Sequence, residues 1–175
     1  MNRVFALILA GVVAGSAGCA TTGATPRPFP TPHAPVATPA PRPATPAPAP
    51  SGHAVGYTVA GTALSLRGAP YRNGGTDPAG FDCSGFVTYV FGQNGVRVPR
   101  TVTEQFHAGR QVAGPQLEPG DLVFFTTVGP GASHVGIAIG GDEFVHAPSS
   151  TGEVRVERMS ASYWATRFVG ARRVL

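Results

Sequence analysis

The 175-residue chain is 42% hydrophobic and carries 13 basic residues, 9 acidic residues and a formal net charge of +4. All the basic residues are arginines. Three of them lie before residue 51, so the remainder of the chain is only +1, with ten arginines against nine acidic residues. These arginines are scattered rather than gathered into a basic stripe, which argues against a nucleic-acid-binding protein.

The N-terminus has the pattern of an export signal. After Arg3 comes an apolar run over residues 4–14, which is shorter than the roughly 20 residues that a membrane span needs and is typical of a secretory signal. The following A-G-C sequence resembles the bacterial lipoprotein signal, although Ser16 stands where an aliphatic residue is usual. We therefore expect a signal peptide over residues 1–18, cleavage before Cys19 and a lipid on Cys19 that anchors the exported protein to a membrane. The alternative is an ordinary signal that leaves an incidental thiol.

Proline divides the rest of the chain. Of the 18 prolines, 11 fall within residues 26–50, and so proline-rich a segment lacks backbone donors and core-forming side chains. We expect residues 19–52 to be a disordered Pro/Ala/Thr-rich tether that favours the extended polyproline II conformation. Residues 53–175 are then long enough to form one globular domain with its own core.

Cys83 is the only cysteine after residue 53. An unpaired thiol in an exported protein suggests that its chemistry is used. Apolar residues follow it at helical spacing and Asp82 is a suitable N-cap, so we expect Cys83 in the first turn of a helix. There the free N–H groups and the helix dipole favour a lowered thiol pKa, and Gly80 and Gly85 leave room for a substrate, which together indicate a nucleophile. The alternative is a buried cysteine that packs as a small hydrophobe.

Two histidines lie on neighbouring predicted strands. Residues 133–140 alternate with period two, which predicts one apolar face and a second face on which His134 is the only large side chain. His146 lies on the returning strand. In an antiparallel pair of strands, the numbers of opposed residues have a constant sum, and opposed residues share a face. A two-residue turn at residues 141–142 gives a sum of 283, which places His134 and His146 on opposite faces, whereas an even sum such as 282 places them on the same face. We therefore expect a bulge or an odd-length loop near residues 140–142.

Cys83, His134 and His146, with their surroundings, resemble the NlpC-type cell-wall cysteine peptidases, a bacterial branch of the papain-like superfamily. The matching blocks are G-A-P-Y-R-N-G-G (68–75), F-D-C-S-G-F (81–86), P-R-T-V-T-E-Q (99–105), L-E-P-G-D-L-V-F-F (117–125), S-H-V-G-I-A-I-G (133–140) and E-F-V-H-A (143–147). The resemblance implies an α+β, papain-like fold. In this fold an N-terminal helical subdomain packs on a mostly antiparallel sheet of about five to six strands, and residues 53–175 form the catalytic domain.

The resemblance also implies a thiol mechanism that hydrolyses peptide bonds in the stem peptides or cross-links of bacterial peptidoglycan. It assigns Cys83 as nucleophile, His134 as base and His146 as the residue that orients the base. It implies peptidoglycan as the substrate, no cofactor, no bound metal and a monomer in the cell envelope.

Three further residues belong to the predicted site. Tyr71 is expected beside the active site, where its hydroxyl and the Cys83 N–H would form an oxyanion pocket. Asp82 and Ser84 are expected to act as a helix cap and a small neighbour. We expect the rest of the domain to be scaffold. It includes a capping box at residues 101–104 that opens a helix, a connecting turn anchored by Tyr163–Trp164, and later strands that contain Val154, Val156 and residues 168–174.

Three alternatives remain open. The same scaffold could carry another thiol amidase or acyltransferase, or a wall-binding module without activity. A Cys-His-His zinc site would need a fourth protein ligand, and none stands at the usual spacing.

Overall fold

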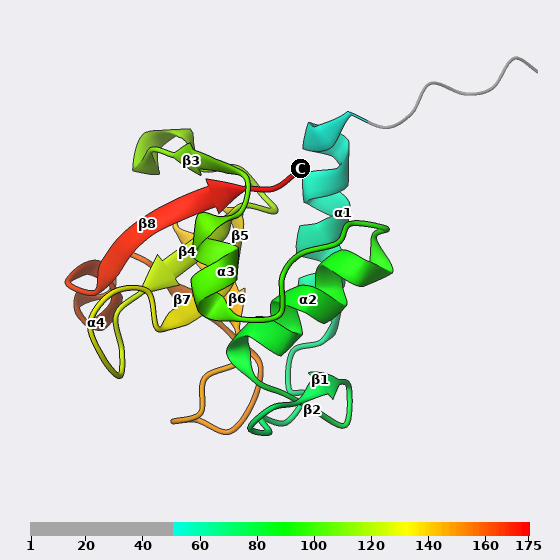
Figure 1. The fold of residues 1–175 in the computed structure, drawn as a ribbon, viewed down its shortest axis with the longest axis vertical. Coiled ribbons are helices and arrows are strands. Elements are labelled where there is room, and N and C mark those ends of the chain that lie inside the picture. Colours follow the sequence, from blue (N-terminus) through cyan, green and yellow to red (C-terminus); the bar gives the residue numbers. More distant parts are fainter. Residues whose placement is uncertain (1–50) are drawn as a thin grey trace, which may run out of the picture. The chain divides into compact units, whose positions relative to one another are not determined.

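The computed structural model describes residues 51–175. The predicted signal peptide (1–18), the predicted lipid on Cys19 and all but the last two residues of the predicted tether (19–52) lie outside the described residues. Within residues 51–175 no helix has the length and hydropathy needed to cross a bilayer. Figure 1 shows the elements, which are α1 Gly52–Ser65, β1 Thr76–Asp77, β2 Gly80–Phe81, α2 Cys83–Gln93, α3 Val102–His107, β3 Arg110–Val112, the 3-10 helix η1 Gly114–Gln116, β4 Leu122–Phe125, β5 His134–Gly140, β6 Glu143–His146, β7 Arg155–Arg158, α4 Ser162–Ala165 and β8 Phe168–Arg173.

Capping side chains set where the helices begin. The Asp82 carboxylate accepts a hydrogen bond from the Gly85 N–H at 2.6 Å, so α2 begins at Cys83 as expected. Thr101 and Glu104 form the predicted capping box at the start of α3. Helix α1 was not among the predicted elements. It is capped by Ser51, whose side chain accepts from the Ala54 N–H.

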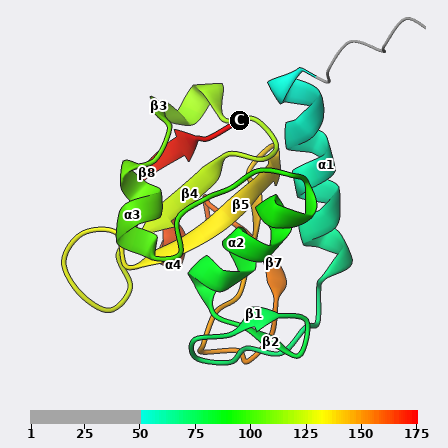
Figure 2. The same cartoon turned by 45° about the vertical axis from the view of Figure 1, so that its right-hand side comes forward.

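The six larger strands form one antiparallel sheet in the order β3-β8-β4-β5-β6-β7. Helix α2 packs against β5, and Figure 2 shows it crossing in front of the central strands β4 and β5. Strands β1 and β2 form a separate small hairpin just before α2. The predicted α+β class, with a helical part packed on an antiparallel sheet, is therefore confirmed. The connection that Tyr163–Trp164 was expected to anchor is the short helix α4, which joins β7 to β8 and buries Trp164.

The pairing of β5 with β6 has the predicted register. Ile137 pairs with Val145 and Ala138 with Phe144, so the residue numbers sum to 282, and the register then shifts between Ala138 and Gly140. This irregularity places an extra residue in β5 ahead of the turn. Because of it, His134 and His146 lie on the same face of the sheet, as expected.

The sheet is buried on both faces. One face packs against α1 and α2 in the larger core, which contains Val59, Phe86 and Ile137. On the other face His134 is the only large side chain that β5 itself contributes, as expected. A second apolar cluster from neighbouring elements, which includes Phe144 and Trp164, covers this face. His134 therefore lies in a largely dry environment, with only 7% of its surface exposed.

Candidate active site

Cys83 lies at the N-terminus of α2 and is only partly exposed. Burial, together with the nearby Asp82 carboxylate, raises the pKa of its thiol, and the backbone N–H groups of Ser84 and Val135 oppose this shift without reversing it. The expected lowering of the Cys83 pKa is therefore wrong for the free protein. Desolvation of the anion outweighs the favourable position at the helix N-terminus, so the resting thiol keeps its proton at neutral pH.

The glycines around Cys83 serve chain packing. A Cβ on Gly85 would overlap the carbonyl oxygen of Gly75, and a Cβ on Gly80 would fall 2.5 Å from the Cβ of Arg72. The expectation that Gly80 and Gly85 leave room for a substrate is therefore wrong. Their missing side chains instead let the β1–β2 hairpin and the preceding loop pack tightly against the start of α2.

Asp82 and Ser84 share a network with Arg100, a residue in one of the matching sequence blocks whose role was not predicted. The Arg100 guanidinium donates to both Asp82 carboxylate oxygens, at 3.0 and 2.5 Å, and to the Ser84 hydroxyl at 2.8 Å. Burial alone would raise the pKa of Asp82, but the hydrogen bonds from Arg100 and the Gly85 N–H bring it below its usual value. Asp82 is thus an ionised cap held by an arginine, consistent with the structural role expected for it.

His134 and His146 form a buried hydrogen-bonded pair. Nε2 of His134 lies 2.8 Å from Nδ1 of His146. Burial lowers the pKa of His134 to about 4, and burial together with His134 and Arg155 lowers that of His146 to about 2. Both rings are therefore neutral at physiological pH. Trp164 stacks on His134 with ring centroids 5.6 Å apart and shields it from solvent.

The structure brings the start of β5 next to Cys83. The N–H of Val135, the residue after His134, is close enough to the sulfur to influence its pKa. Because Nε2 of His134 is occupied by His146, Nδ1 is the nitrogen available to the thiol. The hydrogen bonds within residues 51–175 do not include one between the sulfur and this ring, as is common before a substrate binds. Proton transfer therefore requires a closer approach of the two groups.

Tyr71 lies near Cys83 and Asp82. The partly buried Tyr71 phenol has a pKa raised by burial and by the nearby Cys83 and Asp82 groups. Its backbone is held by a hydrogen bond from the Tyr71 N–H to the Gly152 carbonyl at 2.7 Å. The phenol therefore stays protonated and can donate a hydrogen bond near the sulfur.

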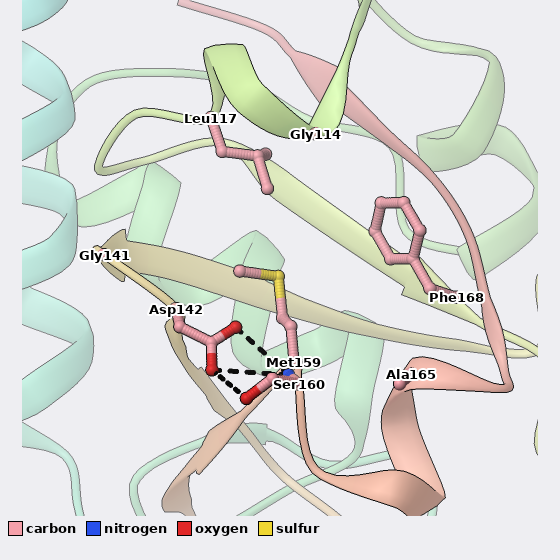
Figure 3. A pocket seen from close by; sticks show the side chains of 8 residues that line it. All are labelled: Gly114, Leu117, Gly141, Asp142, Met159, Ser160, Ala165 and Phe168. Atoms are coloured by element: carbon pink, nitrogen blue, oxygen red, sulfur yellow. Dashed lines mark hydrogen bonds between the residues drawn. The ribbon is translucent and has the colours of Figure 1, made fainter.

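Two hollows lie on different parts of the domain. One, of about 160 Å³, adjoins the histidine pair and is lined by Thr127, Val128, His134, Pro148, Ser149, Ser150, Tyr163 and Trp164. A larger one, of about 360 Å³, lies beside the β5–β6 turn. Figure 3 shows Leu117, Met159 and Phe168 around this second hollow and the hydrogen bonds between Asp142 and Ser160. None of the predicted site residues lines the second hollow, and His134 is the one that lines the first.

Within residues 51–175 no cluster of three or more histidine, cysteine or acidic side chains has a metal-binding arrangement.

Known proteins match most of the described residues. The model of the NlpC/P60 family matches residues 68–173. The chain is 42% identical over 113 residues to the murein DD-endopeptidase MepH of Escherichia coli K12. The aligned region covers 62% of this chain and 42% of that protein. It is 44% identical over 110 residues to the murein DD-endopeptidase MepS/murein LD-carboxypeptidase of the same strain, covering 62% of this chain and 57% of the relative. The match therefore spans about half the length of these relatives.

A solved structure gives the same result. The NlpC/p60 domain of the peptidoglycan hydrolase SagA superposes with a TM-score of 0.59 at 36% identity, covering 67% of this chain and 97% of that domain.

Proposed function

Since the chain belongs to the NlpC/P60 family, we propose that it is a peptidoglycan endopeptidase that works through Cys83, His134 and His146. The observation that carries the proposal is the buried histidine pair, whose ring nitrogens are 2.8 Å apart, beside a strand end that adjoins the Cys83 sulfur. A neutral imidazole held by a second polar group is the arrangement that a thiol nucleophile needs as its base.

The acylation step begins from a neutral thiol and a neutral imidazole. His134 takes the thiol proton on Nδ1 as the sulfur bonds to the substrate carbonyl carbon, and the carbonyl electron pair moves onto oxygen. The Tyr71 hydroxyl and the Cys83 N–H donate to this oxyanion. The intermediate then collapses, the C–N bond breaks and the leaving amine takes the proton from His134, which leaves an acyl-enzyme thioester.

Deacylation repeats these steps with water. His134 removes a proton from water as the water oxygen attacks the thioester carbonyl. The C–S bond breaks, the sulfur regains the proton from His134, and the free carboxyl product departs. His146 keeps the His134 ring in place through both half-reactions, because it remains bonded to the opposite nitrogen.

We expect the scissile bond to join two D-configured centres of a peptide cross-link. Two relatives at 42% and 44% identity are murein DD-endopeptidases, and this is the support for assigning the same class of bond to this chain. Export, a lipid on Cys19 after removal of residues 1–18, a tether over 19–52 and a monomeric state belong to the same proposal. Replacing Cys19 with Ser would then release the protein from the membrane fraction.

The proposal is tested by digesting purified cross-linked muropeptides with the wild-type protein and with Cys83→Ala, followed by mass spectrometry of the products. We expect the wild type to convert cross-linked dimers into monomers and Cys83→Ala to give no cleavage, with an unchanged unfolding midpoint. Cleavage of acyl esters in place of muropeptides would favour an amidase or acyltransferase. Binding without turnover would favour a wall-binding module. Cleavage that survives Cys83→Ala would remove Cys83 from its role.

A further inference from the structure

One nitrogen of the histidine pair is both buried and without a hydrogen-bond partner. Nε2 of His146 is fully buried and makes no hydrogen bond within the described residues. Leaving a buried polar group unpaired costs about 1–3 kcal/mol, so such a nitrogen in a native site calls for an explanation. The nearest acidic group is Glu157, whose Oε1 lies 3.9 Å from His146 Nε2.

The pairing of β6 with β7 places Glu157 beside this nitrogen. In the β6–β7 ladder, His146 pairs with Arg155 and Phe144 pairs with Glu157. His146 and Glu157 are therefore diagonal neighbours on one face of the sheet. The other carboxylate oxygen of Glu157 accepts from the Trp164 indole N–H, and Arg155 Nε lies 3.1 Å from Oε1. The carboxylate is thus held by two side chains, Trp164 from α4 and Arg155 from its own strand β7.

The proton positions along the chain of rings follow from the proposed chemistry. To accept the thiol proton, His134 must be unprotonated at Nδ1, so in its neutral form it carries a proton on Nε2. That proton points at Nδ1 of His146, 2.8 Å away, which must then accept it. His146 must therefore carry its own proton on Nε2, the nitrogen that faces Glu157.

We propose that Glu157 is a positioning residue that accepts the Nε2 proton of His146 and thereby holds His134 in the form that can act as a base. This proposal rests on the proposed function, because it concerns the same site. The partly exposed Glu157 carboxylate, with 25% of its side-chain surface accessible, has room to shorten the 3.9 Å separation to a hydrogen bond. Its negative charge also favours the positive charge that His134 gains during proton transfer, while Arg155 partly offsets this effect.

The kinetic test compares Glu157→Gln with the wild type and with Glu143→Gln. The side-chain oxygen of the introduced glutamine keeps the hydrogen bond from Trp164, which turns its NH₂ group toward His146 Nε2 and favours the wrong ring tautomer. We expect kcat to fall about 10- to 100-fold, the cost typical of removing the partner that orients a metal-bound histidine, with KM within about twofold. Glu143 is the matched control because it pairs with Arg158 at 3.6 Å on the opposite face of the same strands. An unchanged kcat in Glu157→Gln would overturn the proposal.

A spectroscopic test does not depend on activity. Long-range ¹H–¹⁵N correlation spectra of histidine-labelled protein report which ring nitrogen carries the proton. We expect His146 to be protonated on Nε2 in the wild type and on Nδ1 in Glu157→Gln. Protonation on Nδ1 in the wild type would refute the role of Glu157. Because this spectrum is recorded on the wild-type protein, it tests the proposal even if Glu157→Gln fails to fold. A wild-type protein that cleaves no muropeptide would instead refute the proposed function and leave the tautomer spectrum to decide the role of Glu157.

Discussion

The two buried neutral histidines make the stability of the domain depend on pH. Their folded-state pKa values are about 4 for His134 and about 2 for His146, against 6.5 for an ordinary histidine. Below pH 6.5 the unfolded chain takes up protons that the folded chain refuses, so acidification favours unfolding. The contribution is complete above about pH 6.5 and is lost progressively as the pH falls toward the folded-state values.

The size of this effect follows from the pKa differences. A solution at pH 5 is about 1.5 units below the pKa of a histidine in the unfolded chain. At about 1.4 kcal/mol per unit, each buried ring then destabilises the fold by about 2 kcal/mol. Together, His134 and His146 should lower the free energy of unfolding by about 4 kcal/mol between pH 8 and pH 5. That is a large fraction of the roughly 5–15 kcal/mol typical of a domain.

Urea unfolding at pH 8 and pH 5 measures this loss. We expect about 4 kcal/mol for the wild type and about 2 kcal/mol for His146→Asn, which retains one buried ring. His107→Asn is the matched control, because this exposed histidine lies on α3 and its removal leaves both buried rings in place. Equal losses in the wild type and in His146→Asn, or a gain in stability on acidification, would refute the assignment of a buried neutral pair.

Two further predictions concern the start of α2. Because burial and Asp82 raise the pKa of Cys83, its alkylation by iodoacetamide should keep accelerating from pH 6 to pH 9; a plateau reached below pH 7 would instead indicate a preformed thiolate. Gly85→Ala places a methyl group on the Gly75 carbonyl oxygen and should lower the free energy of unfolding by about 1–3 kcal/mol. The control Gly92→Ala, on the same helix with open space around the new Cβ, should be neutral or stabilising, and equal urea midpoints for the two variants would contradict this reasoning.

Local patterns in the sequence predicted much of the site scaffold. The N-cap at Asp82, the capping box at Thr101 and the shared face of His134 and His146 follow from spacing over a few residues, and the structure contains all three. The β5–β6 register was predictable because strand pairing obeys simple arithmetic once two residues are required to meet.

Features that depend on distant packing could not be predicted in this way. The raised pKa of Cys83 arises from burial, which its own helix does not reveal. Helix α1 has glycines and β-branched residues that weaken its helical signal, and packing of Val59 in the larger core compensates for this. The position of Glu157 beside His146 depends on the pairing of the edge strand β7, which no short motif specifies.

The irregularity in β5 near Ile139 constrains how the exposed turn after it can change. Surface turns usually tolerate an added or deleted residue. Here, a change of one residue between Ala138 and Glu143 that neither the irregularity nor the turn absorbed would carry His146 to the opposite side of the sheet. A change of two residues would leave the parity of the pairing unchanged. Any odd change in length must therefore be taken up locally at this end of the strand, although it lies far from the sulfur.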